Sequence, residues 1–407
     1  MRLTHSRRLA ATITTLISLV SLAVGAAPAG AADFYDPPAP LPSGHAGDII
    51  RHQPTTFFLD PVKLIPAPAS AQLIMYRSTD AHGDPVAVTG TVLTPTTPWT
   101  GPGQRPIVSY AVGTQGMGDQ CAPSKALAGG YEYEGVFIDG LLTRGYGVVL
   151  TDYEGLGTPG VHTYVNRKAE GYAVLDAARA AQRLPDAHLP SNGPIAIAGY
   201  SQGGGASAAA AELQPTYAPE LDLKGAYAGA PPADLAAVAK SLDGQYAVGF
   251  LMFAVASMNY AYPELNIPAL LNEKGKALES AVETECTVDG LVKNAFTKTA
   301  DLTADGRPIT DYLADEPFAS VVAEQLIGTI APKVPVLVEH SSADDIVPFE
   351  QGRQMARSWC SEGATVQFDA LAVPTHVGGF VAAYPAALNW LDGRLKGAPA
   401  PDNCGAF

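Results

Sequence analysis

The sequence predicts an α/β fold, in which a mostly parallel β-sheet carries helices on both faces. Short, continuous apolar runs alternate along the chain with longer helical stretches, and such runs are typical of parallel strands that are buried on both sides. The chain has 407 residues, of which 47% are hydrophobic and 16% charged. This composition can bury a sizeable core and excludes a disordered chain.

The first 32 residues predict a secretory signal peptide. Arg2, Arg7 and Arg8 precede an apolar run at residues 9–24, and small residues follow as far as Ala32. The apolar run is shorter than the roughly 20 residues that span a bilayer, and no second segment of membrane length follows. We therefore expect cleavage near Ala32, a secreted protein and no integral membrane segment.

The mature chain begins with a lead-in rich in proline and glycine, residues 33–70, which predicts extended structure. Strands are then predicted at residues 72–77, 86–93, 107–112, 147–150, 195–198, 226–229, 334–340 and 366–371. Helices are predicted at residues 169–184, 203–213, 349–359 and 379–395. The first two strands alternate in polarity and are able to pair antiparallel. The later alternation of strand and helix predicts parallel pairing through right-handed crossovers.

Residues 231–315 interrupt this alternation because they contain no strong strand signal. Helices are predicted there at residues 233–242, 247–258 and 274–282, and the second of these is very apolar. We expect a helical lid or cap that lies over the sheet and divides the core into residues 33–230 and 316–407. The sequence leaves open that these are ordinary core helices.

The formal net charge of −15 argues against sequence-independent binding of nucleic acid and against a polybasic contact with anionic membranes. Docking on a neutral lipid surface through apolar contacts stays possible. All four cysteines lie in the mature chain, and their even number predicts two disulfides in an exported protein, with three pairings open. The absence of a C-x-x-C pair disfavours zinc.

The strongest chemical signal is the sequence Gly199-Tyr200-Ser201-Gln202-Gly203, which follows an apolar run and precedes a helix of small residues. This is the pattern of a nucleophile elbow, where a sharp turn lifts the serine hydroxyl clear of the backbone. Side chains at the two glycines would collide with the neighbouring strand and helix. The pattern predicts Ser201 as a nucleophile; a glycine-rich turn without activity is the weaker alternative.

A serine hydroxyl needs a base, and in folds with this elbow an acid and then a histidine follow the serine. Only His340 and His376 follow Ser201, and His340 precedes the candidate acids. We therefore expect His376, in the loop between the last strand and the last helix, to be the base. Asp344 and Asp345 both follow the preceding strand. One of these aspartates should orient the histidine and the other should be a turn residue. Their spacing does not decide which aspartate has which role.

Two donors should stabilise the oxyanion that forms at the substrate carbonyl. The backbone amide of Gln202 is one, and the glycine-rich loop at residues 113–121 should supply the other from Gln115, assisted by Thr114. Residues 155–160 match G-x-G-x-x-G, but Pro159 and the exported context disfavour nicotinamide binding, so a loop packed near the site is expected.

Taken together, these segments resemble the secretory lipase family of the α/β-hydrolase superfamily, typified by fungal lipase A and its bacterial relatives. The similar segments are residues 33–38, 119–124, 151–157, 199–203, 343–348 and 374–376. The resemblance implies the α/β-hydrolase fold with Ser201 as nucleophile, Asp344 as acid and His376 as base. One departure is the loop at Gln115, which lacks the acidic residue that fungal members carry.

The resemblance also implies disulfides between Cys121 and Cys286 and between Cys360 and Cys404, and a lid over an acyl pocket. The sequence thus predicts a secreted lipase, acting as a monomer without metal or organic cofactor on esters at a lipid–water interface. Triacylglycerols are the expected substrates, hydrolysed through an acyl-enzyme. The alternatives are a short-chain esterase, an acyltransferase, a serine peptidase, or a non-catalytic lipid-binding protein on the same scaffold.

Overall fold

A nine-stranded β-sheet runs through residues 33–407, the part of the chain that this computed structural model describes; the predicted signal peptide, residues 1–32, lies outside it. The strands are β1 (Ile49–Thr55), β2 (Ala69–Thr79), β3 (Pro85–Pro95), β4 (Ile107–Ala111), β5 (Gly147–Thr151), β6 (Ile195–Tyr200), β7 (Leu223–Gly229), β8 (Val336–Ala343) and β9 (Val366–Pro374). Their order across the sheet is β1-β2-β3-β5-β4-β6-β7-β8-β9. From β5 to β9 all neighbours pair in parallel.

The fold class predicted from the apolar runs is confirmed, and so is the antiparallel pairing of β2 with β3. Strands β4, β5 and β6 are buried along their whole length, as expected for strands covered on both faces. Strand β1 was not predicted and lies inside the lead-in. It pairs only with β2, and its polar sequence with Pro54 suits an edge position.

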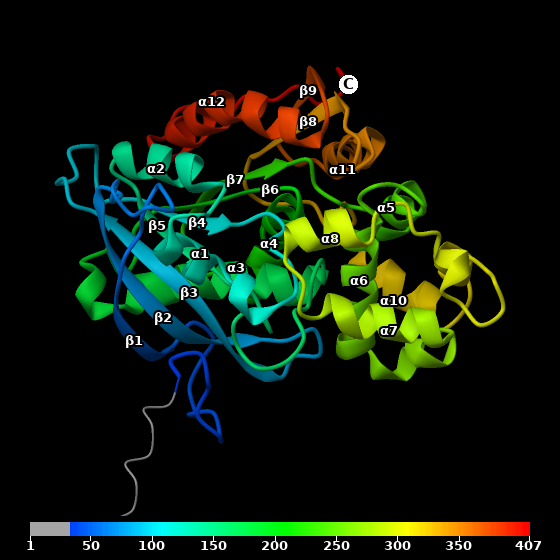
Figure 1. Cartoon of the computed structure of the whole chain (residues 1–407). Helices are drawn as coiled ribbons and strands as arrows, with labels where there is room; N and C mark the ends of the chain where they lie inside the picture. The colour runs from blue at the N-terminus through cyan, green and yellow to red at the C-terminus, as the bar shows by residue number, and fades with distance from the viewer. Residues whose placement is uncertain (1–32) are drawn as a thin grey trace, which may run out of the picture. The chain divides into compact units, whose positions relative to one another are not determined.

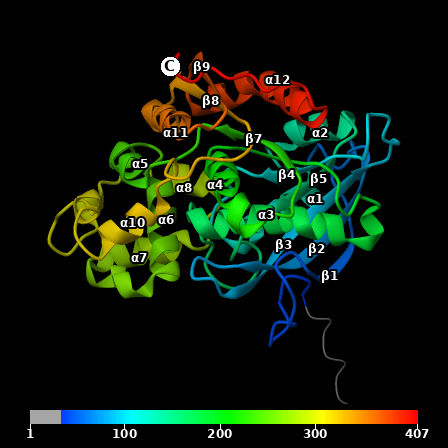
Figure 2. The same cartoon turned by 180° about the vertical axis from the view of Figure 1, so that it is seen from behind.

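Helices cover both faces of the sheet (Figures 1 and 2). On one side lie α3 (Arg167–Arg183) and α4 (Gln202–Tyr217), and on the other α2 (Gly135–Thr143) and α12 (His376–Leu395). The remaining core helices are α1 (Pro123–Gly129), α11 (Phe349–Ser361), η1 (Asp119–Cys121) and η2 (Pro185–Ala187). The small residues of α4 let it lie close against the sheet, where a side chain at Gly204 would overlap the Gly229 carbonyl.

Between β7 and β8 the chain forms a helical insertion around a second hydrophobic core, to which Ala81, Met117 and Tyr164 also belong. Its helices are α5 (Leu235–Leu242), α6 (Val248–Ala261), η3 (Pro263–Leu265), η4 (Ile267–Ala269), α7 (Glu273–Val282), α8 (Thr287–Lys293), η5 (Thr299–Asp301), α9 (Ile309–Tyr312) and α10 (Phe318–Gln325). The apolar helix α6 contacts α5, α7 and α8. Phe318 and Val321 of α10 join this core, so the helical stretch continues past residue 315. The boundaries and lid role drawn from the sequence stay predictions.

Within residues 33–407, no helix combines the length and the apolar character needed to cross a bilayer. Parallel strands β4, β6 and β8 end at one edge of the sheet, which is where ligand sites of open α/β sheets form. Ser201 directly follows β6 and Asp344 directly follows β8, while His376 comes two residues after the end of the neighbouring parallel strand β9.

Candidate active site

Ser201 lies at a sharp turn between β6 and α4. Its backbone torsions are φ 60° and ψ −126°, a strained conformation for a residue with a side chain. A hydrogen bond of 2.9 Å from the Ser201 amide to the carbonyl of Gly229 ties the turn to β7. A Cβ at Gly199 would overlap the Gly203 carbonyl, and one at Gly203 would overlap the Ala111 carbonyl. Both glycines are therefore required, as expected for an elbow.

Asp344 directly follows β8 and hydrogen-bonds the ring of His376. The distance from His376 Nδ1 to Asp344 Oδ2 is 2.7 Å, and the Asp344 side chain is fully buried. The other carboxylate oxygen accepts the backbone amides of Ile346 and Val347. Burial alone would raise the pKa of Asp344, but hydrogen bonds from His340 and His376 hold that pKa below its ordinary value. Asp344 is thus an ionised carboxylate at neutral pH.

His376 lies beside the elbow, packed against the residue that precedes the serine. Its carbonyl accepts the Tyr200 hydroxyl at 2.8 Å, and the two ring centroids are 5.1 Å apart. His376 begins helix α12, whereas the sequence placed it in a loop, and the side chain of Thr375 caps that helix. Nε2 of His376 is buried and has no hydrogen-bond partner among residues 33–407, Ser201 included. This nitrogen is the ring atom left for a substrate or nucleophile proton.

Asp345 also contacts His376, but through the backbone. Its Oδ1 accepts the His376 amide at 2.8 Å, and its Oδ2 accepts the hydroxyl of Tyr246, a residue of the insertion, at 2.9 Å. His340, which the sequence order set aside as a base, is fully buried with Nε2 3.4 Å from Asp344 Oδ2. Sequence reasoning missed the supporting roles of His340 and Tyr246, because both depend on contacts that no motif encodes.

The side chains of the predicted oxyanion residues are all held by other groups. Gln115 Nε2 donates to Glu132 at 3.1 Å, and burial raises the pKa of that acid to about 7. Thr114 Oγ1 lies 2.9 Å from the Tyr164 hydroxyl. The backbone amides are therefore the better candidates for donors. Gln202 is the first residue of α4, where an amide has no acceptor within its helix.

The Gln202 side chain is anchored by two buried groups that the sequence did not reveal. Its Nε2 lies 2.7 Å from Glu170 Oε1 and 3.0 Å from His162 Nε2. Burial lowers the pKa of His162 to about 4, so at neutral pH the ring is uncharged and its Nε2 can accept. The side-chain NH₂ of Gln202 thereby donates both of its hydrogens.

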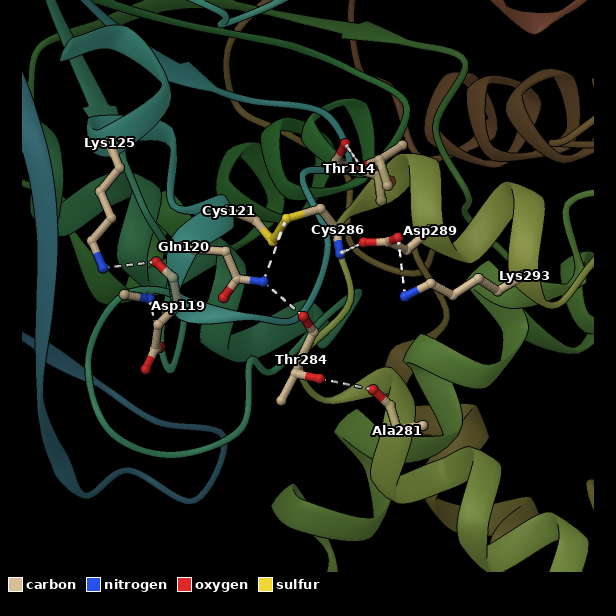
Figure 3. Close-up of a disulfide and its surroundings, with 12 residues drawn as sticks. Thr114, Asp119, Gln120, Cys121, Lys125, Ala281, Thr284, Cys286, Asp289 and Lys293 are labelled. Carbon is tan, nitrogen blue, oxygen red and sulfur yellow. Dashed lines mark hydrogen bonds and ion pairs between the residues drawn. A yellow bond between two sulfur atoms is a disulfide. The ribbon is translucent and has the colours of Figure 1, made fainter. Parts of the chain in front are cut away.

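Two disulfides connect the four cysteines in the pairing that the family resemblance implied. Cys121 pairs with Cys286, and Cys360 pairs with Cys404. The first joins the loop after β4 to the start of α8, across 165 residues of sequence (Figure 3). Leu156 packs against this disulfide, so the loop with the G-x-G-x-x-G pattern is part of the packing here.

An apolar cavity adjoins the serine, and a second apolar cavity lies next to the first. The first has Ser201 and Gln202 in its wall, together with side chains of α5 and α6. The second lies inside the insertion and is lined almost entirely by apolar side chains. Residues common to both walls are Leu235, Ala239, Leu251 and Ala254. The two cavities are therefore neighbours, one at the elbow and one inside the insertion.

A serine elbow at the carboxyl edge of a mostly parallel sheet, with helices on both faces, defines an α/β-hydrolase. The family model described as secretory lipase matches residues 122–403. A Mycobacterium tuberculosis protein named "Probable inactive lipase MT1628" is 31% identical, over 91% of this chain and 83% of that one. Lipase 5 of Candida albicans is 30% identical, over 91% and 82%.

The structure is similar to that of Candida antarctica lipase A in its closed state. The TM-score is 0.79 at 25% identity, over 89% of this chain and 85% of that chain. The chain belongs to the secretory lipase family, and ester hydrolysis is the reaction class of that family. Membership of this family and the two disulfides fit an extracellular protein.

Proposed function

We propose that this protein is a secreted serine lipase that hydrolyses long-chain carboxylic esters, triacylglycerols above all. The observation that carries the proposal is the pair formed by Asp344 and His376 at 2.7 Å, beside the elbow of Ser201, with Nε2 of the histidine free of other partners among residues 33–407. This arrangement fits a base that is oriented by a buried carboxylate and faces a nucleophile.

In the proposed mechanism, Ser201 Oγ attacks the ester carbonyl carbon while His376 Nε2 takes the hydroxyl proton. The amides of Gln202 and Gln115 stabilise the negative oxygen of the tetrahedral intermediate. His376 then gives its proton to the departing alcohol, which leaves an acyl-enzyme. Water then attacks the acyl carbon and gives a proton to the same nitrogen. When this second tetrahedral intermediate collapses, His376 returns the proton to Ser201 Oγ and the fatty acid leaves. Asp344 stays ionised and stabilises the imidazolium.

The apolar cavities support a substrate with a long acyl chain. Such a chain, bound at Ser201, extends past Leu251 and Ala254 into the insertion, where it meets few polar atoms. Each buried methylene is worth about 0.8 kcal/mol, so long chains gain most from this space. We propose that the insertion acts as the lid that covers this path.

Hydrolysis of soluble and emulsified esters of increasing chain length tests the proposal, with S201A as the matched inactive variant. We expect turnover of emulsified long-chain triacylglycerol, and a loss of at least about 10³-fold in S201A with an unchanged melting temperature. Retained activity in S201A contradicts the proposal. A preference for acetate and butyrate esters favours a short-chain esterase, and acyl transfer to added alcohols in place of fatty acid release favours an acyltransferase.

A second candidate follows from the relative whose name calls it inactive. In that case this chain binds lipid on a hydrolase fold without turning it over. The buried, ionised Asp344 bonded to His376 argues against this role, because no binding function needs that pair. Binding of fatty acid without hydrolysis of any ester would establish it.

A further inference from the structure

The peptide bond between Thr114 and Gln115 is held by two hydroxyl groups from different parts of the fold. The Thr114 carbonyl accepts the Thr287 hydroxyl at 2.6 Å and the Tyr133 hydroxyl at 3.2 Å. Tyr133 lies just before α2 in the core, whereas Thr287 is the first residue of α8 in the insertion. A carbonyl oxygen has two lone pairs, so both of its acceptor sites are used.

This arrangement fixes the direction of the next backbone amide. A trans peptide is planar, and its N–H points opposite to its C=O. The Gln115 N–H therefore points away from the Thr287 and Tyr133 hydroxyls. This N–H donates no hydrogen bond within residues 33–407. An oriented amide without a protein partner, in the loop beside the elbow, is suited to stabilise an oxyanion.

A short segment of the insertion, Glu285 to Thr287, also holds the loop through its backbone, and we call this segment the brace. The Thr287 amide donates to the Gln115 carbonyl at 3.0 Å, and the Met117 amide donates to the Glu285 carbonyl at 2.8 Å. Gly116 lies opposite Cys286 with a φ of 124°, and a side chain at this glycine would overlap the brace. The disulfide to Cys121 closes the contact covalently (Figure 3).

The core holds the other end of the same loop next to the elbow. The loop leaves β4 where Ala111 pairs with Gly199 of β6, two residues before the serine. The Gly113 amide donates to Glu134 at 2.8 Å. The Tyr164 hydroxyl, bonded to Thr114 Oγ1, belongs to a residue in the wall of the Ser201 cavity. The loop is thus fixed to the core on one side and to the insertion on the other.

We propose that Thr287 is a positioning residue for ester hydrolysis, and that its hydroxyl holds the Thr114 carbonyl so that the Gln115 amide faces the oxyanion. The insertion then supplies part of the oxyanion site as well as covering the acyl path. The inference rests on the proposed function, since an oxyanion forms only if Ser201 attacks an ester.

The experiment compares T287V, which removes the hydroxyl at nearly constant shape, with T287S, which keeps it. Thr284 offers a matched control on the other side of Cys286, because among residues 33–407 its hydroxyl hydrogen-bonds only the nearby Ala281 carbonyl (Figure 3). For each variant, kcat and KM for a soluble p-nitrophenyl ester are measured, with the inhibition constant of an alkyl trifluoromethyl ketone, which forms a tetrahedral adduct with a nucleophilic serine.

A complete loss of an oxyanion donor costs about 10²–10³-fold in rate. T287V leaves Tyr133 on the carbonyl, so we expect kcat to fall about tenfold, KM to stay unchanged, and ketone affinity to fall by the same factor as kcat. The kcat and ketone affinity of T287S should lie within about twofold of the wild-type values, and those of T284V should equal the wild-type values. Y133F removes the other hydroxyl and should also lower kcat, and the double variant should approach about 10²-fold.

An active wild type with wild-type kcat in T287V overturns the inference and leaves the proposed function standing. A loss that T287S does not rescue, or that T284V shares, also overturns it, because the effect is then one of general stability. If T287V does not fold, Y133F alone decides, and unchanged kcat and ketone affinity in Y133F refute the positioning of this carbonyl. A wild type that hydrolyses no ester removes the proposed function and this inference together.

Discussion

Replacing Asp344 by Asn should lower kcat about 10⁴-fold, which corresponds to about 5 kcal/mol of transition-state stabilisation. The structure limits the change to one carboxylate oxygen, Oδ2, which faces the rings of His376 and His340. Asn keeps an oxygen that can accept the amides of Ile346 and Val347, so the turn after β8 is preserved. What changes is the partner of His376 Nδ1, at present a carboxylate oxygen at 2.7 Å, and the NH₂ that replaces this oxygen also faces His340 Nε2, which lies 3.4 Å from it.

The loss arises from the tautomer of the ring. An asparagine NH₂ facing His376 Nδ1 favours the form with its proton on Nε2, and that form cannot accept the proton of Ser201. D345N is the matched control. Its oxygen can still accept the His376 amide, and its NH₂ then faces the Tyr246 hydroxyl, whose oxygen can accept a hydrogen bond in place of donating one, so we expect less than about a fivefold loss.

The assay is steady-state hydrolysis of p-nitrophenyl butyrate by both variants, with the melting temperature of each recorded. In D344N, kcat should fall with little change in KM, because the carboxylate stabilises the transition state and not the bound substrate. A larger loss in D345N than in D344N, at equal melting temperature, would show that the acid has been assigned to the wrong aspartate.

Three further predictions concern the acyl path, stability and pH. Ala254 lies in the wall of both cavities, so A254F should obstruct the proposed acyl path and lower kcat/KM for p-nitrophenyl palmitate about tenfold while sparing p-nitrophenyl butyrate; an equal loss of kcat/KM for both esters contradicts the proposed path. Removing the disulfide at Cys360, which spans 44 residues, should cost up to about 4 kcal/mol of unfolding free energy at unchanged kcat, as measured by urea denaturation. Burial raises the pKa of Glu339 to about 8, whereas the same carboxyl in the unfolded chain loses its proton near pH 4. Between about pH 4 and pH 8 the folded state therefore holds a proton that the unfolded state has lost, and stability should fall as the pH rises through this range. In E339Q the decrease in melting temperature between about pH 5 and pH 9 should be smaller.

The parts of the fold that follow local physics could be predicted from the sequence. Apolar runs mark strands that are covered on both faces, and the glycines around Ser201 mark a turn without room for side chains. Strand β1 gave no such signal, because an edge strand that pairs on one side tolerates polar residues. Helix α10 was missed because its eight residues are fewer than the roughly 11–18 over which a helical period can be recognised.

The candidate site also has parts that the sequence predicts and parts that it does not. Chain order points to Ser201 and His376, but the choice between Asp344 and Asp345 depends on which way each side chain turns after β8. The contact of Thr287 with Thr114 joins residues 173 positions apart, and neither belongs to a motif. Such contacts are determined by tertiary packing, so sequence patterns alone do not reveal them.

The most direct test of the central claim is the intact mass of the protein after reaction with a p-nitrophenyl alkylphosphonate. We expect Ser201 Oγ to displace p-nitrophenolate and form one phosphonyl adduct, which peptide mapping assigns to Ser201. The adduct should be absent in S201A and should form far more slowly in H376A, which lacks the base. A folded wild type that acquires no adduct, or acquires it on another residue, would contradict the assignment of Ser201 as the nucleophile.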